Sequence, residues 1–149
     1  RPERTVASSF AGGFAALCGD AAHTMSPIGG QGMNTGFADA ALLARVIAEI
    51  QKGHTGGRAL LEGYQRVRHR AARVAARRAW ISMKIGTTTG RVPSYLRNQL
   101  IKLLARTRLK RGVVRHFTML SVPYHSVAQG IAALGLSPAD REPYERKKQ

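Results

Sequence analysis

The sequence predicts a mostly α-helical chain that begins with one or two β-strands. Two short runs near the N-terminus, 6–10 and 14–18, are rich in apolar, β-branched or aromatic residues, as strands are. From Thr35 onward, apolar residues recur three and four positions apart, which is the spacing of amphipathic helices. Glycine-rich segments separate these patterns, so we expect strands, then a loop, then successive helices.

Both strands are expected to end at glycine. The first run is followed by Gly12 and Gly13. The run 14–18 has five apolar residues in succession and stops at Gly19-Asp20, which predicts a buried strand closed by a turn. The core of the next segment, 20–34, is expected to be loop because it is rich in glycine.

The first helix is expected over 35–50. Asn34 or Thr35 is its predicted N-cap, because short polar side chains bond the free N–H groups of a first turn. Its predicted end is Lys52-Gly53.

Two further helices follow. The second begins near Arg58 and is broken by glycine and threonine over 86–90, and Pro93 can open the third. The residues after 116 are less regular, and 138–149 are expected to be frayed.

The chain divides into three regions by charge, 1–57, 58–115 and 116–149. Cations and anions number four and four in the first region, sixteen and one in the second, and four and three in the third. The formal net charge of +16 therefore belongs mainly to a basic helical region, 58–115, followed by a C-terminal helix and tail.

Composition excludes several classes of protein. An apolar fraction of 44% excludes wholesale disorder, and no apolar run approaches the roughly 18 residues of a membrane span. The N-terminus lacks the order of a secretory signal, and the single Cys18 excludes a disulfide framework. We therefore expect a cytoplasmic protein. Because its first residue is Arg1 rather than Met, we also expect a processed chain or a fragment.

The segment from Gly19 to Asn34 carries the predicted chemistry. A strand delivers one carboxylate, Asp20, at its carboxyl end, where ligands bind in open α/β sheets. Glycines just before the helix let backbone N–H groups approach a ligand, and the helix dipole favours negative charge there. The pattern predicts a cofactor half-site, with a carboxylate for a polyol and a helix N-terminus for an anion-like ring edge.

This segment resembles the second flavin-binding motif of the single-component FAD-dependent monooxygenases, the aromatic hydroxylases similar to p-hydroxybenzoate hydroxylase. The matching residues are Gly19-Asp20-Ala21-Ala22-His23, Pro27, Gly30-Gln31-Gly32-Met33-Asn34 and Asp39. Weaker support comes from Leu60-Leu61-Glu62-Gly63-Tyr64 and Arg68, which resemble the family's next helix. The resemblance implies a three-layer α/β FAD-binding fold, of which region 1–57 would be the C-terminal part.

The resemblance also implies residue roles. Asp20 would bond the ribityl chain of FAD, and Pro27 would lie beside the isoalloxazine. The backbone of Gly30, Gln31, Gly32, Met33 and Asn34 would face the pyrimidine edge. No catalytic residue is assigned, because the flavin does the chemistry. The implied reaction uses NADH or NADPH and O2 to hydroxylate an aromatic or polyketide-like small molecule; a related flavin reductase or dehydrogenase remains an alternative.

Two elements of the family are missing from the sequence. No Gly-x-Gly-x-x-Gly turn is present to cradle the FAD diphosphate, and the family's middle Asp-Gly motif is absent. We therefore expect this chain to be the C-terminal part of such an enzyme, to need the missing N-terminal part as its partner, and to bind FAD weakly or not at all alone.

Other interpretations stay open. His23 is expected to fix the loop rather than to catalyse. A metal site at His23 is not expected, because the sequence has no second ligand at useful spacing from it. Cys18 is expected to be a small apolar residue. The arginine stripe of the second helix, at 66, 70, 73 and 77, fits a solvated face, an acidic partner, nucleotide phosphates or lipid.

The alternative function is a basic helical module that binds nucleic acid or an anionic membrane. Specific nucleic-acid binding is not expected, because aromatic residues make up only 6% of the chain and no recognised motif appears. A peripheral membrane contact through the basic helices is left open.

Overall fold

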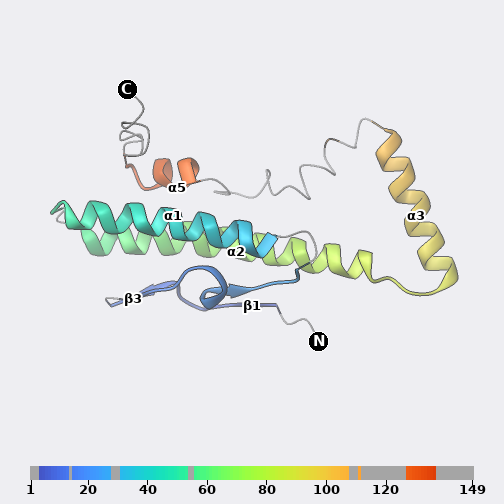
Figure 1. The fold of residues 1–149 in the computed structure, drawn as a ribbon, viewed down its shortest axis with the longest axis horizontal. Coiled ribbons are helices and arrows are strands. Elements are labelled where there is room, and N and C mark those ends of the chain that lie inside the picture. Colours follow the sequence, from blue (N-terminus) through green and yellow to red (C-terminus); the bar gives the residue numbers. More distant parts are fainter. Residues whose placement is uncertain are drawn as a thin grey trace, which may run out of the picture.

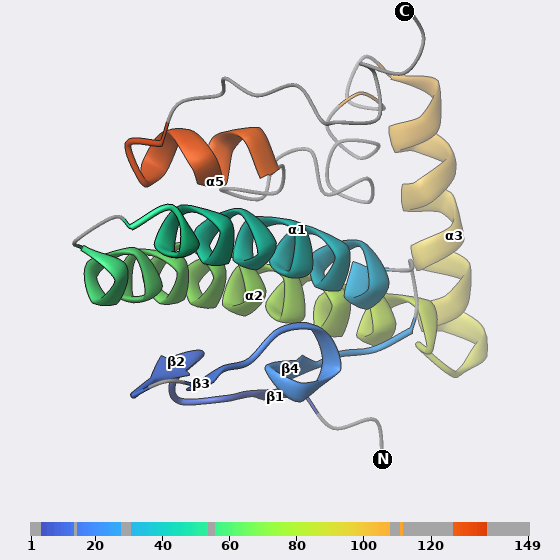
Figure 2. The same cartoon turned by 60° about the vertical axis from the view of Figure 1, so that its left-hand side comes forward.

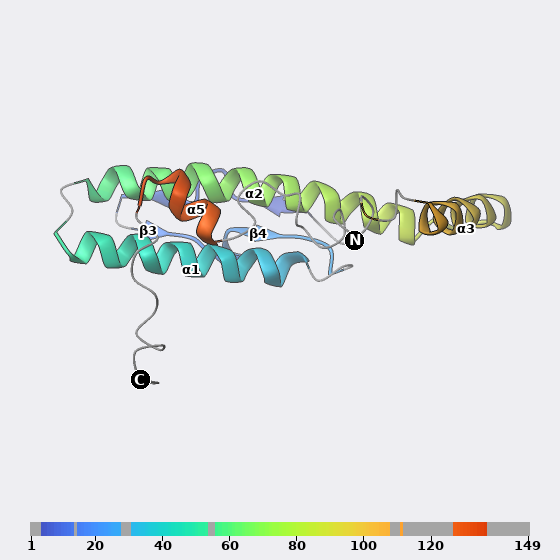
Figure 3. The same ribbon diagram turned by 90° about the horizontal axis from the view of Figure 1, so that it is seen from above.

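Two long antiparallel helices, α1 (Gln31–Gln51) and α2 (Gly57–Gly86), form the centre of the molecule (Figure 1). The computed structural model describes residues 4–13, 15–27, 31–53, 56–107, 111 and 127–136. Short strands cover one face of the helix pair, and α5 (Val127–Ala133) lies on the opposite face (Figure 2). Seen from above, α3 (Arg91–Arg106) extends beyond the C-terminal end of α2 (Figure 3).

The N-terminal region forms four two-residue strands, more than the one or two that the sequence predicts. They are β1 (Thr5–Val6), β2 (Ala11–Gly12), β3 (Ala15–Ala16) and β4 (His23–Thr24). β1 pairs antiparallel with β4, placing Thr5 opposite Thr24, and β2 pairs antiparallel with β3. The two pairs are separate two-stranded sheets.

The prediction of a buried strand over 14–18 is wrong. Of its described residues, 15–18, only Ala15 and Ala16 are in strand conformation, and Leu17 remains 36% exposed. β3 turns back on β2 through Gly13, whose φ of +58° suits glycine, so the segment is one arm of a hairpin. Within the described residues this hairpin has no third strand beside it, so its edges have no strand partner there.

The prediction that α1 starts at Asn34 or Thr35 is also wrong, because α1 starts at Gln31. Thr35 lies inside the helix, where its Oγ1 donates to the Gln31 carbonyl at 2.8 Å. Gly32, which was expected to lie in a loop, is helical, and Gly36 serves packing. A Cβ at Gly36 would lie 3.2 Å from the Gly19 Cα, so its absence lets the helix touch the preceding turn.

The boundaries of α2 and α3 agree with the predicted breaks near 58 and over 86–90. Pro93 lies in the first turn of α3 rather than at its first residue. Arg97 Nη1 donates to the carbonyls of Ile85, Gly86 and Thr88 at 3.0–3.3 Å. These bonds satisfy the last carbonyls of α2 and fix the direction in which α3 leaves it. The predicted tail 138–149 lies outside the described residues.

The hydrophobic core lies between the helix pair and the strands. Phe10 from the N-terminal region, Leu42 and Val46 from α1, and Tyr64 and Val67 from α2 are its larger buried members. A stripe of alanines on α2 is also buried, comprising Ala71, Ala72, Ala75, Ala76 and Ala79. Because alanine side chains are small, this stripe lets other elements approach the helix closely.

In contrast, α3 buries none of its described side chains. Six of its apolar residues are more than half exposed, among them Val92 at 68% and Leu96 at 61%, and Leu104 is partly buried. None of the helices in the described part of the chain combines the length and the apolarity needed to cross a bilayer.

We expect Leu42→Ala to lower the free energy of unfolding by about 2–5 kcal/mol, because Leu42 is 1% exposed and its removal leaves a cavity in the core. Urea unfolding followed by circular dichroism measures the change. Leu100→Ala on α3 is the matched control, since Leu100 is 56% exposed and should change stability by less than about 0.5 kcal/mol. Equal losses in the two variants would contradict this account of the core.

Candidate functional site

The candidate site begins at a short 3₁₀ turn, η1 (Gly19–Ala21), whose middle residue is Asp20. Gly19 has a φ of +60°, and the Ala22 N–H donates to its carbonyl at 2.9 Å, which closes the turn. The Asp20 side chain is exposed and makes no hydrogen bond or ion pair to any residue in the described ranges. Its carboxylate is therefore available to a ligand.

A second carboxylate, that of Asp39 on α1, holds this turn in place through hydrogen bonds. Asp39 is fully buried, and its Oδ2 accepts hydrogen bonds from the Gly19 N–H at 3.1 Å and from His23 Nε2 at 2.6 Å. Its Oδ1 accepts from Arg68 Nε on α2 at 2.6 Å. One carboxylate thus joins the turn, β4, α1 and α2.

The ion pair between Asp39 and Arg68 is sealed from solvent, since their side chains are 0% and 1% exposed. Arg68 Nη2 also donates to the Thr35 carbonyl at 3.2 Å. A buried ion pair of this kind adds little net stability over an apolar replacement, but removing one partner alone leaves an unpaired buried charge. The pair therefore acts mainly by specifying how α1, α2 and the turn fit together.

His23 is a structural partner of Asp39. Because a carboxylate only accepts, His23 Nε2 must carry the proton of this hydrogen bond. The ring is 1% exposed and lies 6.1 Å from the Phe10 ring, centroid to centroid. This burial agrees with the expectation that His23 fixes the loop. It also keeps the His23 ring away from a reacting ligand.

The other edge of the site is the first turn of α1. Met33 is 65% exposed and Asn34 is also exposed, whereas Gln31 is fully buried. Both amide atoms of the Gln31 side chain lack a hydrogen-bond partner among the described residues. The predicted ligand residue Gly30 lies outside the described residues, and Pro27 just before the gap is exposed.

Tyr64 supports the turn from α2. Its hydroxyl donates to the Leu17 carbonyl at 2.8 Å, just before Gly19. Burial, and then the nearby Asp39 carboxylate, raise the pKa of Tyr64 well above its usual value. The phenol therefore stays protonated and remains a donor throughout the neutral pH range.

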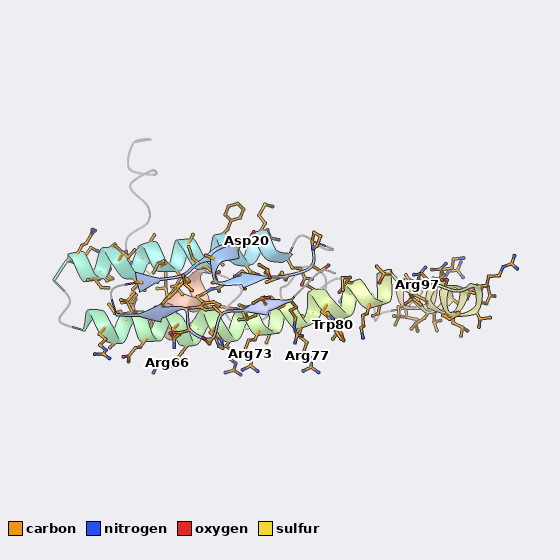
Figure 4. The ribbon with its side chains drawn as sticks, turned by 90° about the horizontal axis from the view of Figure 1, so that it is seen from below. Asp20, Arg66, Arg73, Arg77, Trp80 and Arg97 are labelled. Carbon is orange, nitrogen blue, oxygen red and sulfur yellow. The ribbon has the colours of Figure 1, made fainter. Side chains whose placement is uncertain are left out.

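The arrangement fits the flavin end of FAD, the group that the resemblance implies. Contact between Gly19 and Gly36 places Asp20 beside the first two turns of α1, and Figure 4 shows Asp20 on the α1 side of the molecule. An unbonded carboxylate can accept from polyol hydroxyls, and the N–H groups of a helix start can donate to an anion-like ring edge. The Gln31 amide, which has no partner among the described residues, lies buried in this first turn of α1.

Sequence reasoning did not predict the buried network. Asp39 and Arg68 entered only as members of a resemblance, because residues 29 positions apart carry no periodic signal. One signal was present: Asp39 lies between Ala38 and Leu42 on the buried stripe of α1. A carboxylate on an apolar face needs a buried partner, and only a cation or a set of N–H donors can serve.

Replacing each of the two aspartates separates their roles. We expect Asp39→Asn to lower the free energy of unfolding by about 3–5 kcal/mol, because it leaves the Arg68 guanidinium buried without its counter-ion. Asp20→Asn is the matched control and should change stability by less than about 0.5 kcal/mol, since Asp20 is exposed. Urea unfolding measures both; a loss below about 1 kcal/mol for Asp39→Asn would show that the network does not hold the site.

Comparison with known proteins agrees with this geometry. The family described as FAD binding domain matches residues 2–79, just over half of the chain. The chain is 36% identical over 97 residues to the 3-(3-hydroxy-phenyl)propionate/3-hydroxycinnamic acid hydroxylase of Mycolicibacterium smegmatis. It is 36% identical over 110 residues to the "uncharacterized aromatic compound monooxygenase YhjG" of Bacillus subtilis, and 43% identical over 75 residues to the tetracenomycin A2 monooxygenase-dioxygenase of Streptomyces glaucescens.

These alignments cover 65%, 74% and 50% of the chain, but only 17%, 22% and 13% of the respective relatives. No solved structure matches the chain. The matched residues 2–79 contain the Asp20 turn, all of α1 and both members of the buried ion pair. The chain therefore belongs to the FAD binding domain family, and FAD is its cofactor.

Proposed function

We propose that this chain supplies the flavin-ring half of the cofactor site in an FAD-dependent monooxygenase, which hydroxylates an aromatic or polyketide-like small molecule with NAD(P)H and O2. One observation carries the proposal. The Asp20 carboxylate, which has no partner among the described residues, lies beside the first two turns of α1 in a turn that the buried Asp39 holds through the Gly19 N–H. The names of the relatives, an aromatic hydroxylase and two monooxygenases, support this reaction class.

Each part of the half-site has a defined task. Asp20 accepts hydrogen bonds from the ribityl hydroxyls, which fixes the cofactor along its length. The first turn of α1 donates N–H groups toward the pyrimidine edge, and its dipole stabilises negative charge that develops there. Bound FAD supplies the redox chemistry and the activation of O2.

Exposed apolar side chains border this half-site. Met33 is 65% exposed and Phe37 is 66% exposed on successive turns of α1. When a cofactor and substrate cover them, these side chains exclude water from the reacting region, which limits side reactions. We assign them no catalytic role.

The remaining contacts to FAD are proposed to come from polypeptide outside these 149 residues. The sequence has no Gly-x-Gly-x-x-Gly turn for the diphosphate. It spans no more than 22% of the relatives reported above, whose additional length could contain such a turn. The aromatic substrate and the choice between NADH and NADPH would likewise depend on that polypeptide.

The test is flavin binding by the chain alone and by the chain joined to whatever its gene encodes upstream. We expect the extended protein to purify with flavin absorbance and the 149-residue chain to retain little or none. In the extended protein, Asp20→Asn should weaken FAD binding about tenfold or more while leaving unfolding unchanged, because a charge-assisted acceptor is lost at an exposed position.

Glu62→Gln is the matched control, since Glu62 is an exposed carboxylate on α2 whose one ion-pair partner among the described residues is Arg58. An extended protein that neither purifies with FAD nor takes it up would overturn the proposal. Reaction under isotopically labelled O2 separates the monooxygenase from a flavin reductase or dehydrogenase, because only the monooxygenase places the label in an organic product.

A second candidate function, contact with an anionic membrane surface, is favoured by α3. Exposed apolar side chains gather along one face of this helix; among them are Val92, Leu96, Leu100 and Leu103. The helix carries four cations and no anion; these are Arg91, Arg97, Lys102 and Arg106. A cationic helix with an exposed apolar face is suited to lie in a lipid interface rather than against an acidic protein surface.

We expect the chain to sediment with phosphatidylcholine vesicles that contain phosphatidylserine and not with phosphatidylcholine alone. Leu96→Glu combined with Leu100→Glu should abolish sedimentation, because both side chains are exposed on the apolar face of α3. Ala40→Glu combined with Ala44→Glu adds the same charge at exposed positions of α1 and should have little effect. Binding that both double variants lose equally would be due to net charge alone and would argue against α3 as the contact.

A further inference from the structure

A cleft of about 890 Å³ lies between β1 and the solvent face of α2, and its walls are unusually rich in arginine. We call it the arginine cleft. Its guanidinium-bearing lining residues are Arg4, Arg66, Arg70, Arg73 and Arg77. The four on α2 follow one another three or four residues apart, so they share one helix face and span about 16 Å along it.

Among the described residues, no carboxylate lines the arginine cleft. Asp39, Glu49 and Glu62 pair with cations elsewhere, and Asp20 lies on the α1 side. These four are all the acidic residues in the described ranges. The α2 arginines of the cleft accordingly form no ion pair with a described residue, unlike Arg45, Arg58 and Arg68.

The arginine cleft is separate from the Asp20 site. Figure 4 shows Arg66, Arg73 and Arg77 extending from α2 on the side away from Asp20 and α1. The buried stripe of α2, which includes Ala72 and Ala79, lies between the two regions of the surface. A ligand bound in the arginine cleft would thus not occupy the proposed flavin site.

From this geometry we propose that the arginine cleft binds a small molecule with at least two phosphate groups, of the nucleoside diphosphate class. The planar guanidinium group donates two parallel hydrogen bonds to a phosphate. Several guanidinium groups close together repel one another, and a bound anion relieves that repulsion. Val6, Val74 and Ala76 supply an apolar surface between the arginines. The volume lies within the range of sites for nucleotide-sized ligands, whereas a flat lipid surface could not fill a cleft.

Trp80 provides a direct readout. It is the only tryptophan of the chain, and the guanidinium of Arg4 lies 6.0 Å from its ring centroid. Because Arg4 also lines the arginine cleft, an anion that draws this side chain inward changes the surroundings of the indole. Inorganic pyrophosphate is a suitable probe, because it absorbs no light in the range of tryptophan fluorescence.

The full chain is titrated with pyrophosphate, ADP and orthophosphate, with Trp80 fluorescence and calorimetry as readouts. We expect saturable binding of pyrophosphate and ADP, at least tenfold tighter than that of orthophosphate, because two phosphates engage more guanidinium groups than one. Arg70→Gln combined with Arg73→Gln should weaken pyrophosphate binding about tenfold or more, with unchanged circular dichroism, since both side chains are exposed.

Arg91→Gln combined with Lys102→Gln is the matched control; it removes the same charge from exposed positions on α3, outside the cleft. It should change pyrophosphate affinity less than twofold. Three outcomes would overturn the proposal: no saturable pyrophosphate binding, equal losses in both double variants, or preferential binding of a single-stranded oligonucleotide. None of these readouts depends on flavin, so failure here is distinguishable from failure of the proposed function.

Discussion

The structure of the N-terminal half depends on the buried carboxylate of Asp39. Its two oxygens accept hydrogen bonds from Gly19, His23 and Arg68, which belong to the turn, to β4 and to α2. Two-residue strands have too few ladder hydrogen bonds to fix the N-terminal region alone. A buried anion can be satisfied in few arrangements, so it restricts how these elements pack more than an apolar contact of the same size would.

The helices could be predicted from the sequence and the strands could not. The periodic spacing of apolar residues identified α1, α2 and α3, because each helix is long enough to repeat its pattern several times. The start of α1 was missed because the glycine-rich segment up to Asn34, which includes Gly32, was interpreted as loop. Glycine at 36 is explained by contact with Gly19, which is 17 positions away and leaves no local trace.

The sequence likewise predicted some residues of the candidate site and not others. Asp20 and residues 31–34 were named from the sequence as candidate ligand residues, because the resemblance names them and because a lone carboxylate before a glycine-rich segment is chemically distinctive. The partnership of Asp39 with Arg68 was not predicted, since it joins two helices across the core. Exposed ligand groups follow one another along the chain and can be found there, whereas the groups that support them are brought together only by folding.

The arginines of α2 have different roles, depending on whether an acidic residue lies beside them. Arg68 and Arg66 are two residues apart on α2, yet Arg68 is buried against Asp39 and Arg66 lines an open cleft with no carboxylate. The same residue type therefore specifies packing on one face of the helix and remains available for binding on the other. Neither the net charge of +16 nor the local density of arginine distinguishes these two uses. The distinction depends on where the few acidic residues lie, and the structure places none of those it describes beside the cleft.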